Sequence, residues 1–209
     1  MARVHALLRR VTDQLARAAK CAEAPFYVAY DPSNGCAWLP LGDRTEVDRD
    51  GLSAALQSFA SVCASLGDVH PSLSGFRRTH QQAVIAETVA RIPPQPLEQL
   101  TAYAAVASIA ALASDLDAAR VWVAETLGDL AIDDARHAAL RETARVFFET
   151  GGSYAATAQR LSLHRNTAQY RIRNAEEMRG RAFSEGRLDV ELALQASHWF
   201  GSAVLRKPG

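Results

Sequence analysis

The sequence predicts an α+β protein, in which a small α/β domain with an antiparallel sheet is followed by an all-α domain. Three observations lead to this prediction. Helical periodicity and a hairpin signal alternate within residues 1–92. The proline-rich segment Ile92-Pro93-Pro94-Gln95-Pro96 then interrupts the chain. Each segment after it has helical periodicity. We therefore expect one domain over 1–92 and a helical region over 97–209.

The first domain is predicted to open with an amphipathic helix over residues 2–20, where apolar side chains recur at helical spacing. Two apolar runs follow at 26–30 and 36–41, and Asn34-Gly35 lies between them. Both of these residues tolerate a positive φ, so the pair predicts the turn of a β-hairpin.

The rest of the first domain is expected to contain two helices and a further strand. They are placed at 52–59 (a helix capped by Asp50), 61–66 (a strand) and about 75–91 (a helix opened by Ser72 or Ser74). The last helix carries apolar residues on one face, namely Phe76, Ala83, Ala86 and Val89. These elements suggest an antiparallel sheet that is covered on one side.

Composition excludes several classes of protein. The 209 residues include 23 basic and 23 acidic side chains, so a histone-like protein is excluded and any nucleic-acid site must be a local patch. Cys21, Cys36 and Cys63 are odd in number and widely spaced, which argues against a disulfide framework and a cysteine-rich metal site. We find no signal peptide and no apolar run long enough to span a bilayer. The expectation is a cytoplasmic protein without a cofactor or a membrane partner.

The helical region contains a helix-turn-helix pattern. Its helices are expected at about 97–113, 116–126, 134–149, 153–161, 164–179 and 187–204. Gly151-Gly152 is suited to a left-handed helix end, and Ser153 can cap the next helix. Ser162-Leu163-His164 then forms a short turn before the third helix. This order is typical of a DNA-binding domain, here over about 134–182.

The helix over 164–178 has two faces. Ala168, Ile172 and Ala175 share one face and are expected to pack inward. The other side is rich in groups that can bind base edges or phosphates, and residues 153–182 carry six arginines against two glutamates. The candidate DNA-binding residues are Ser153, Tyr154, His164, Arg165, Asn166, Thr167, Gln169, Tyr170, Arg173 and Arg181.

The string GGSYAATAQRLSLHRNTAQYRIRNAEEMRGR closely resembles the C-terminal helix-turn-helix of PucR/CdaR-family bacterial transcription regulators. His164-Arg165-Asn166-Thr167 and Tyr170-Arg171-Ile172 occupy the hallmark positions. Residues 1–92 resemble the degenerate GGDEF-like domain that precedes this motif in the family, although more weakly. The resemblance implies a sequence-specific DNA-binding transcription regulator. Ala168 and Gln169 depart from the usual larger apolar residue and basic residue, which bears on base preference.

Alternative functions and roles remain open from the sequence. The protein could be a sensor or protein-interaction module whose helix-turn-helix no longer binds DNA. We predict no enzyme activity, because the hairpin has no carboxylate after Asp31 to hold the metal of a nucleotide cyclase. Double-stranded DNA, a second copy in a homodimer and a small-molecule effector are the expected partners. His164 either caps its helix or touches DNA, and Trp199-Phe200 lies either in the core or in a dimer interface.

Overall fold

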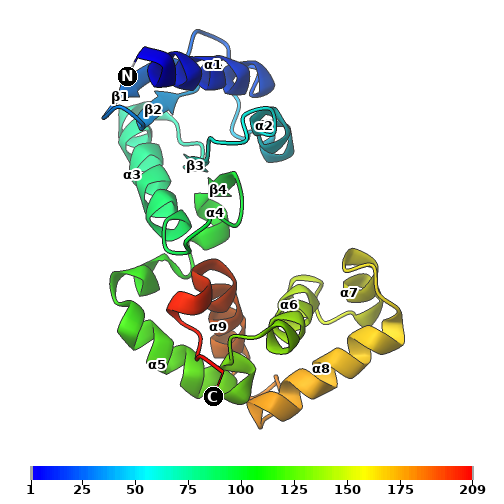
Figure 1. The fold of residues 1–209 in the computed structure, drawn as a ribbon. Coiled ribbons are helices and arrows are strands. Elements are labelled where there is room, and N and C mark those ends of the chain that lie inside the picture. Colours follow the sequence, from blue (N-terminus) through cyan, green and yellow to red (C-terminus); the bar gives the residue numbers. More distant parts are fainter. Residues whose placement is uncertain (1, 209) are drawn as a thin grey trace. The chain divides into compact units, whose positions relative to one another are not determined.

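The computed structural model describes residues 2–208, which divide into two compact units (Figure 1). Unit 1 contains the residues up to Glu87 together with Glu98–Ala105, and unit 2 contains Thr88–Leu97 and the residues from Val106 onward. Unit 1 mixes helices with small sheets, whereas helices dominate unit 2. The predicted fold class is therefore confirmed.

Unit 1 follows the element order helix, hairpin, helix, strand, helix, strand. The bounds are α1 Ala2–Ala18, β1 Phe26–Ala29, β2 Gly35–Trp38, α2 Arg49–Leu56, β3 Ala64–Leu66, α3 Ser72–Ala90, β4 Leu100–Ala102 and α4 Tyr103–Val106. Its core is formed mainly by α1, α2 and β4. The buried side chains of this core are Val11, Ala19, Leu52, Leu56, Val62 and Leu100.

The predicted hairpin is present, but its turn is stabilised by an aspartate. β1 pairs antiparallel with β2, from Phe26 opposite Trp38 to Ala29 opposite Gly35. The Asp31 carboxylate accepts hydrogen bonds from the backbone N–H groups of Ser33 (2.7 Å) and Asn34 (2.8 Å). Such a side chain folds the backbone back on itself without help from a positive φ.

The expected positive φ at Asn34-Gly35 is therefore wrong, because neither residue adopts one. The lack of a side chain at Gly35 instead leaves room for a neighbouring ring. A Cβ at this position would lie 2.6 Å from the Tyr27 ring, which packs over the strand. The Asn-Gly pair thus predicted the position of the turn correctly. The turn is stabilised by the Asp31 carboxylate, however, and not by a positive φ.

A single antiparallel sheet is a wrong prediction, because β3 pairs parallel with β4 in a second two-stranded sheet. The helix expected over 97–113 is also wrong. Leu100 and Thr101 are buried in β4, and only the short α4 and a 3₁₀ turn, η1 Ala110–Ser114, follow within that range. Pairing with β3 outweighs the helix propensity of this alanine-rich segment.

Two helix starts differ from prediction. Asp48, not Asp50, caps α2, and its carboxylate accepts a hydrogen bond from Gly51 N at 2.9 Å. α3 begins at Ser72, three residues before the predicted start at 75. On the expected apolar face of α3, Ala86 is buried, whereas Phe76 is 41% exposed.

Unit 2 contains five α-helices among the described residues, and they match the predicted ranges closely. The bounds are α5 Leu116–Leu127, η2 Gly128–Ala131, α6 Ala135–Glu149, α7 Tyr154–Arg160, α8 Arg165–Arg179, α9 Arg187–Phe200 and η3 Gly201–Ala203. The helix predicted over 187–204 ends earlier, at Phe200, since Gly201 has a φ of 54° and the chain continues as a 3₁₀ turn.

α9 packs against α5 and α6, and α6 in turn packs against α7 and α8 (Figure 1). Trp199 and Phe200, at the end of α9, are 5% and 0% exposed. Both therefore belong to the core of unit 2, and the alternative that placed them in a dimer interface is wrong. Among the described helices, none has the length and apolar character needed to cross a bilayer.

Candidate nucleic-acid interface

Two glycines and a serine determine the backbone conformation between α6 and α7. Gly151 and Gly152 adopt φ values of 67° and 82°, as predicted for a left-handed helix end. Gly152 N donates to Phe147 O at 2.8 Å, which satisfies a carbonyl of the last turn of α6. Ser153 Oγ then accepts a hydrogen bond from Ala156 N at 3.3 Å and caps α7.

The turn between α7 and α8 relies on a non-glycine residue in a left-handed conformation. Ser162 has a φ of 54°, and Leu163 N donates to Ala158 O at 2.8 Å. His164 occupies the N-cap position of α8, but its side chain makes no capping hydrogen bond. The prediction that His164 caps the helix is therefore wrong, and its exposed imidazole is available for other contacts.

Small side chains let α8 pack closely on its neighbours. Ala168, Ile172 and Ala175 are 0%, 2% and 0% exposed, and this face of α8 lies against α6 and α7. A partly buried hydrogen bond of 2.9 Å between the hydroxyl groups of Thr150 and Thr157 joins the end of α6 to α7. The predicted inward face of α8 is thus confirmed, and the rotation of the helix is fixed by packing.

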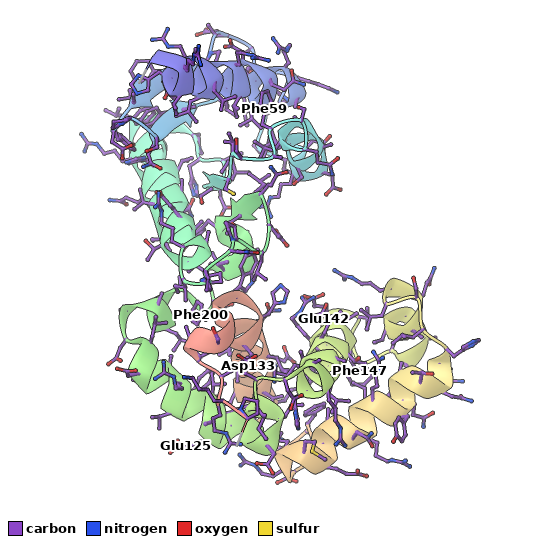
Figure 2. All side chains as sticks on the ribbon, in the orientation of Figure 1. Phe59, Glu125, Asp133, Glu142, Phe147 and Phe200 are labelled. Carbon is purple, nitrogen blue, oxygen red and sulfur yellow. The ribbon has the colours of Figure 1, made fainter. Side chains whose placement is uncertain are left out.

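With that face buried, the opposite face of α8 is exposed (Figure 2). We call the exposed side chains in the first part of this face, from His164 to Arg173, the α8 outer face; the exposed Glu177 follows one turn after Arg173. Its members, all predicted as DNA-binding residues, are His164, Arg165, Asn166, Gln169, Tyr170 and Arg173. They occupy the first three turns of the helix, so the structure brings six of the ten candidate residues together on one surface.

Few interactions within the protein hold the outer face in place. Arg173 forms an exposed ion pair with Glu177 at 3.7 Å, and its guanidinium lies 5.7 Å from the centre of the Tyr170 ring. Exposed ion pairs of this kind contribute little to stability. The guanidinium can therefore exchange Glu177 for an external anion at low cost.

The other four candidate residues lie apart from the outer face. Ser153 caps α7, and the Tyr154 ring packs on Phe147 with ring centres 4.9 Å apart. Thr167 is half-buried. Arg181 lies beyond the other end of α8, where it donates to Glu125 O at 3.2 Å. The 15 residues of α8 rise by roughly 22 Å, so Arg181 is distant from Arg165.

Two of the arginines in the basic segment have structural roles. Arg179 is buried and donates hydrogen bonds to the carbonyl oxygens of Thr126 (3.0 Å) and Glu185 (2.7 Å), as well as to that of Ala182. Burial lowers the pKa of Arg179 from its usual range. Arg171 is half-buried, with Nη1 3.5 Å from Thr143 Oγ1. The local charge available to a ligand is therefore smaller than the count of arginines indicates.

No local sequence pattern indicated this role of Arg179, because the carbonyls that it binds, those of Thr126, Ala182 and Glu185, lie outside the last turn of α8. The neighbouring glycine, Gly180, indicated only where the helix ends. Gly180 does adopt a φ of 79° at this position. On the α8 outer face, by contrast, helical spacing had indicated the residues from Arg165 to Arg173, and the turn before the helix had indicated His164.

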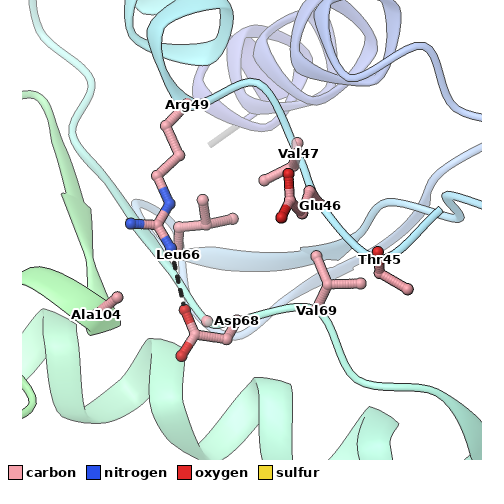
Figure 3. A pocket seen from close by; sticks show the side chains of 9 residues that line it. Thr45, Glu46, Val47, Arg49, Leu66, Asp68, Val69 and Ala104 are labelled. Atoms are coloured by element: carbon pink, nitrogen blue, oxygen red, sulfur yellow. Dashed lines mark hydrogen bonds and ion pairs between the residues drawn. The ribbon is translucent and has the colours of Figure 1, made fainter.

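Unit 1 contains a cavity of about 440 Å³ (Figure 3). It lies at the carboxyl ends of the parallel strands β3 and β4, the edge at which open α/β sheets commonly bind ligands. Arg49 and Asp68 form an ion pair of 3.3 Å in its wall, beside Glu46 and Leu66. Among the described residues of the whole chain, no cluster of three or more histidine, cysteine or acidic side chains is arranged to hold a metal.

Comparison with protein families defines the class of each part. Residues 140–196, from α6 to α9, match the PucR C-terminal helix-turn-helix domain. Residues 2–89 match the GGDEF-like domain. A search of curated proteins found no match. The C-terminal part is therefore a helix-turn-helix domain of the PucR type, which suggests DNA-binding transcription regulation.

Together the two matches give the chain the domain architecture of a PucR-family regulator, a GGDEF-like domain followed by a PucR helix-turn-helix. The resemblance inferred from the sequence motifs is confirmed at this level.

Proposed function

We propose that the protein is a sequence-specific, DNA-binding transcription regulator of the cytoplasm. The observation that carries this proposal is the division of α8 into a buried small-residue face and an exposed face with Arg165, Asn166, Gln169 and Arg173. Exposed amide and guanidinium groups on the second helix of such a motif are typical of a reading surface for the major groove. We assign the GGDEF-like domain to 1–92, the mainly helical region to 97–209, whose first strand β4 pairs with β3 of unit 1, and the DNA-binding domain to about 134–182.

In this proposal the first turns of α8 enter the major groove. Arg165 and Arg173 can bind guanine through two hydrogen bonds, and Asn166 and Gln169 can bind adenine in the same way. His164, Thr167, Tyr170, Ser153 and Tyr154 contact the sugar-phosphate backbone or border the groove. We expect Arg181 to contact a phosphate through the guanidinium N–H groups that do not donate to Glu125 O.

A single reading helix covers few base pairs, so the protein is expected to bind as a homodimer. Two half-sites about one helical turn apart, roughly 34–36 Å, would then match the two-fold symmetry of the dimer. Binding energy would come largely from phosphate contacts and the release of counterions, and specificity from α8.

Selection of ligands from a pool of random duplexes tests the proposal. The full chain should enrich a reproducible motif, and its affinity for that motif should fall steeply as the salt concentration rises. The Arg10→Ala variant, which removes an exposed arginine of α1 outside the motif, is the matched control and should recover the same motif. Retention of random DNA without a motif, or no retention, would favour the alternative of an interaction module that no longer binds specific DNA.

A catalytic role for unit 1 is not part of the proposal. The hairpin carboxylate of Asp31 is engaged in the turn, where Oδ2 accepts from the Asn34 side chain at 2.7 Å and Oδ1 from backbone N–H groups. A nucleotide cyclase needs carboxylates free to hold its metal ions. We instead assign unit 1 to ligand sensing and assembly.

The cavity beside Arg49 and Asp68 is our candidate site in unit 1 for a small-molecule effector (Figure 3). It combines charged groups with the apolar side chains of Val47 and Leu66, and Ala104 in its wall lies two residues before unit 2 begins. In a screen of metabolites, a true effector should raise the melting temperature of the wild type and not of Ala104→Phe, which places a ring at the cavity wall. An equal rise in both would exclude this cavity.

A further inference from the structure

Unit 1 has an exposed apolar surface on α3 and on the hairpin β1–β2. Five large side chains on this surface expose a substantial part of their area to solvent. They are Leu73 (73% exposed), Phe26 (59%), Tyr30 (56%), Val84 (44%) and Phe76 (41%). We call these five residues and the half-buried Trp38 the α3–hairpin surface.

Ring contacts join the two parts of this surface. Trp38 of β2 stacks on Phe76 of α3 with ring centres 4.6 Å apart and planes inclined by 9°. Phe26 lies 5.6 Å from Trp38 across the hairpin, and Tyr30 lies 6.4 Å from His80 of α3. The aromatic side chains therefore form one continuous patch, not scattered single residues.

The apolar residues of α3 also share one side of that helix. Leu73, Phe76, His80 and Val84 follow one another at steps of three or four residues. Gln82 and Ala86, which are 6% and 0% exposed, lie on the opposite side. α3 thus has a second apolar stripe, which the packing of unit 1 does not bury.

The size of the patch fits an interface between proteins. Aromatic side chains have roughly 150–250 Å² of surface and Leu and Val have less, so these five, which are about half exposed, leave roughly 400–500 Å² open to solvent. Patches larger than a few hundred Å² usually mark interaction sites. With a polar rim, such a patch approaches the roughly 800 Å² that each partner buries in a stable complex.

We propose that the α3–hairpin surface is the interface between two copies of this chain. A two-fold interface requires a surface that is complementary to itself. Phe76 and Val84 lie four residues before and after His80, so an antiparallel pair of α3 helices centred on His80 brings Phe76 of each copy level with Val84 of the other. This proposal rests on the proposed function and extends it, because two copies of α8 can bind two half-sites together only in a dimer.

Substitution of the exposed apolar residues tests the interface. Leu73→Glu and Val84→Glu place a carboxylate on the surface at positions where the side chain is already exposed, so the fold of unit 1 should persist. The matched control is Val121→Glu on α5, which changes a 58% exposed valine in unit 2. Circular dichroism of each full-length variant checks that it is folded.

Sedimentation equilibrium without DNA gives the first result. The wild type and Val121→Glu should behave as dimers of the 22.6 kDa chain, and Leu73→Glu and Val84→Glu should dissociate at least tenfold more readily. A wild type that stays monomeric, or folded glutamate variants that dimerise as tightly as the control, would overturn the proposal.

Titration with DNA separates this proposal from the proposed function. Val84→Glu should keep the wild-type affinity for a duplex with one half-site. Its affinity for a duplex with two half-sites should be at least tenfold lower than that of the wild type. If the variants dissociate as expected but no form of the protein binds specific DNA, the interface stands and the DNA-binding function fails.

Discussion

Arginine side chains in the C-terminal unit serve two different purposes, and burial separates them. Arg165 and Arg173 are exposed on the α8 outer face, whereas Arg179 and Arg141 are buried. Arg141 Nη1 donates to Leu130 O at 2.7 Å and to Ile132 O at 2.6 Å. Buried guanidinium groups of this kind join separate segments of the chain by donating to their carbonyl oxygens.

Replacement of Arg179 should therefore destabilise the protein. Arg179→Ala removes a buried side chain and the guanidinium donor of the Thr126 and Glu185 carbonyls, and we expect the free energy of unfolding to fall by roughly 2–4 kcal/mol. Arg165→Ala, the exposed control at the other end of α8, should change it by less than about 0.5 kcal/mol. Urea denaturation of both variants measures the difference, and equal losses would contradict the assigned roles.

At the scale of elements, the turn of the helix-turn-helix contains a conformational strain that can be removed. Ser162 connects α7 to α8 with a φ of 54°, which a side chain with a Cβ adopts at a cost. Ser162→Gly should therefore raise the free energy of unfolding by about 0.5–1 kcal/mol. Ser153→Gly, which removes the α7 cap instead, should not raise it. A loss of stability in Ser162→Gly would contradict this account of the turn.

The contact between α6 and α9 should make stability depend on pH. Burial, followed by the charge of Arg145, lowers the pKa of His198 below its ordinary value of 6.5, even though Glu142 and Glu149 lie near it. The unfolded chain then binds a proton at higher pH than the folded chain does. Stability should decrease as the pH falls below about 6.5, until the lower pKa of the folded state is passed.

The His198→Gln variant should lose this component of the pH dependence. Chemical denaturation at several pH values between 5 and 8 provides the measurement, with the unmodified protein as the reference. Burial also acts on Glu142, whose pKa is nevertheless lowered by Arg145, so a further loss of stability at more acidic pH should remain in the variant. An unchanged profile between 5 and 7 would exclude His198 as its source.

Some elements could be predicted from the sequence and others could not, for physical reasons. The spacing of Ala168, Ile172 and Ala175 fixed the orientation of α8, because only one rotation buries all three. β4 could not be predicted, since its partner β3 lies more than thirty residues earlier and its own residues favour a helix. The role of Arg179 depends on three carbonyls from two separate segments, which no local pattern reveals.

At the scale of the whole molecule, the proposed function depends on two surfaces. The α8 outer face contacts DNA, and the α3–hairpin surface joins two copies of the chain. If both surfaces act as proposed, the spacing of half-sites controls affinity. Insertion of about 5 base pairs between the half-sites turns one of them to the other side of the duplex. The affinity of the dimer should then fall toward that of a single half-site, as a gel-shift titration would show. An affinity that is unchanged by the insertion would contradict binding by a two-fold dimer.

The most direct test of the central claim compares base preference before and after loss of one side chain of the α8 outer face. Duplexes that carry the selected motif with each base pair changed in turn are titrated with the wild type, Arg165→Ala and Arg10→Ala. The account predicts that Arg165→Ala binds the motif about 1–3 kcal/mol more weakly and loses its preference at one base position, while Arg10→Ala behaves as the wild type. A folded Arg165→Ala protein that keeps both its affinity and its preference at every position would contradict the claim that α8 reads the DNA.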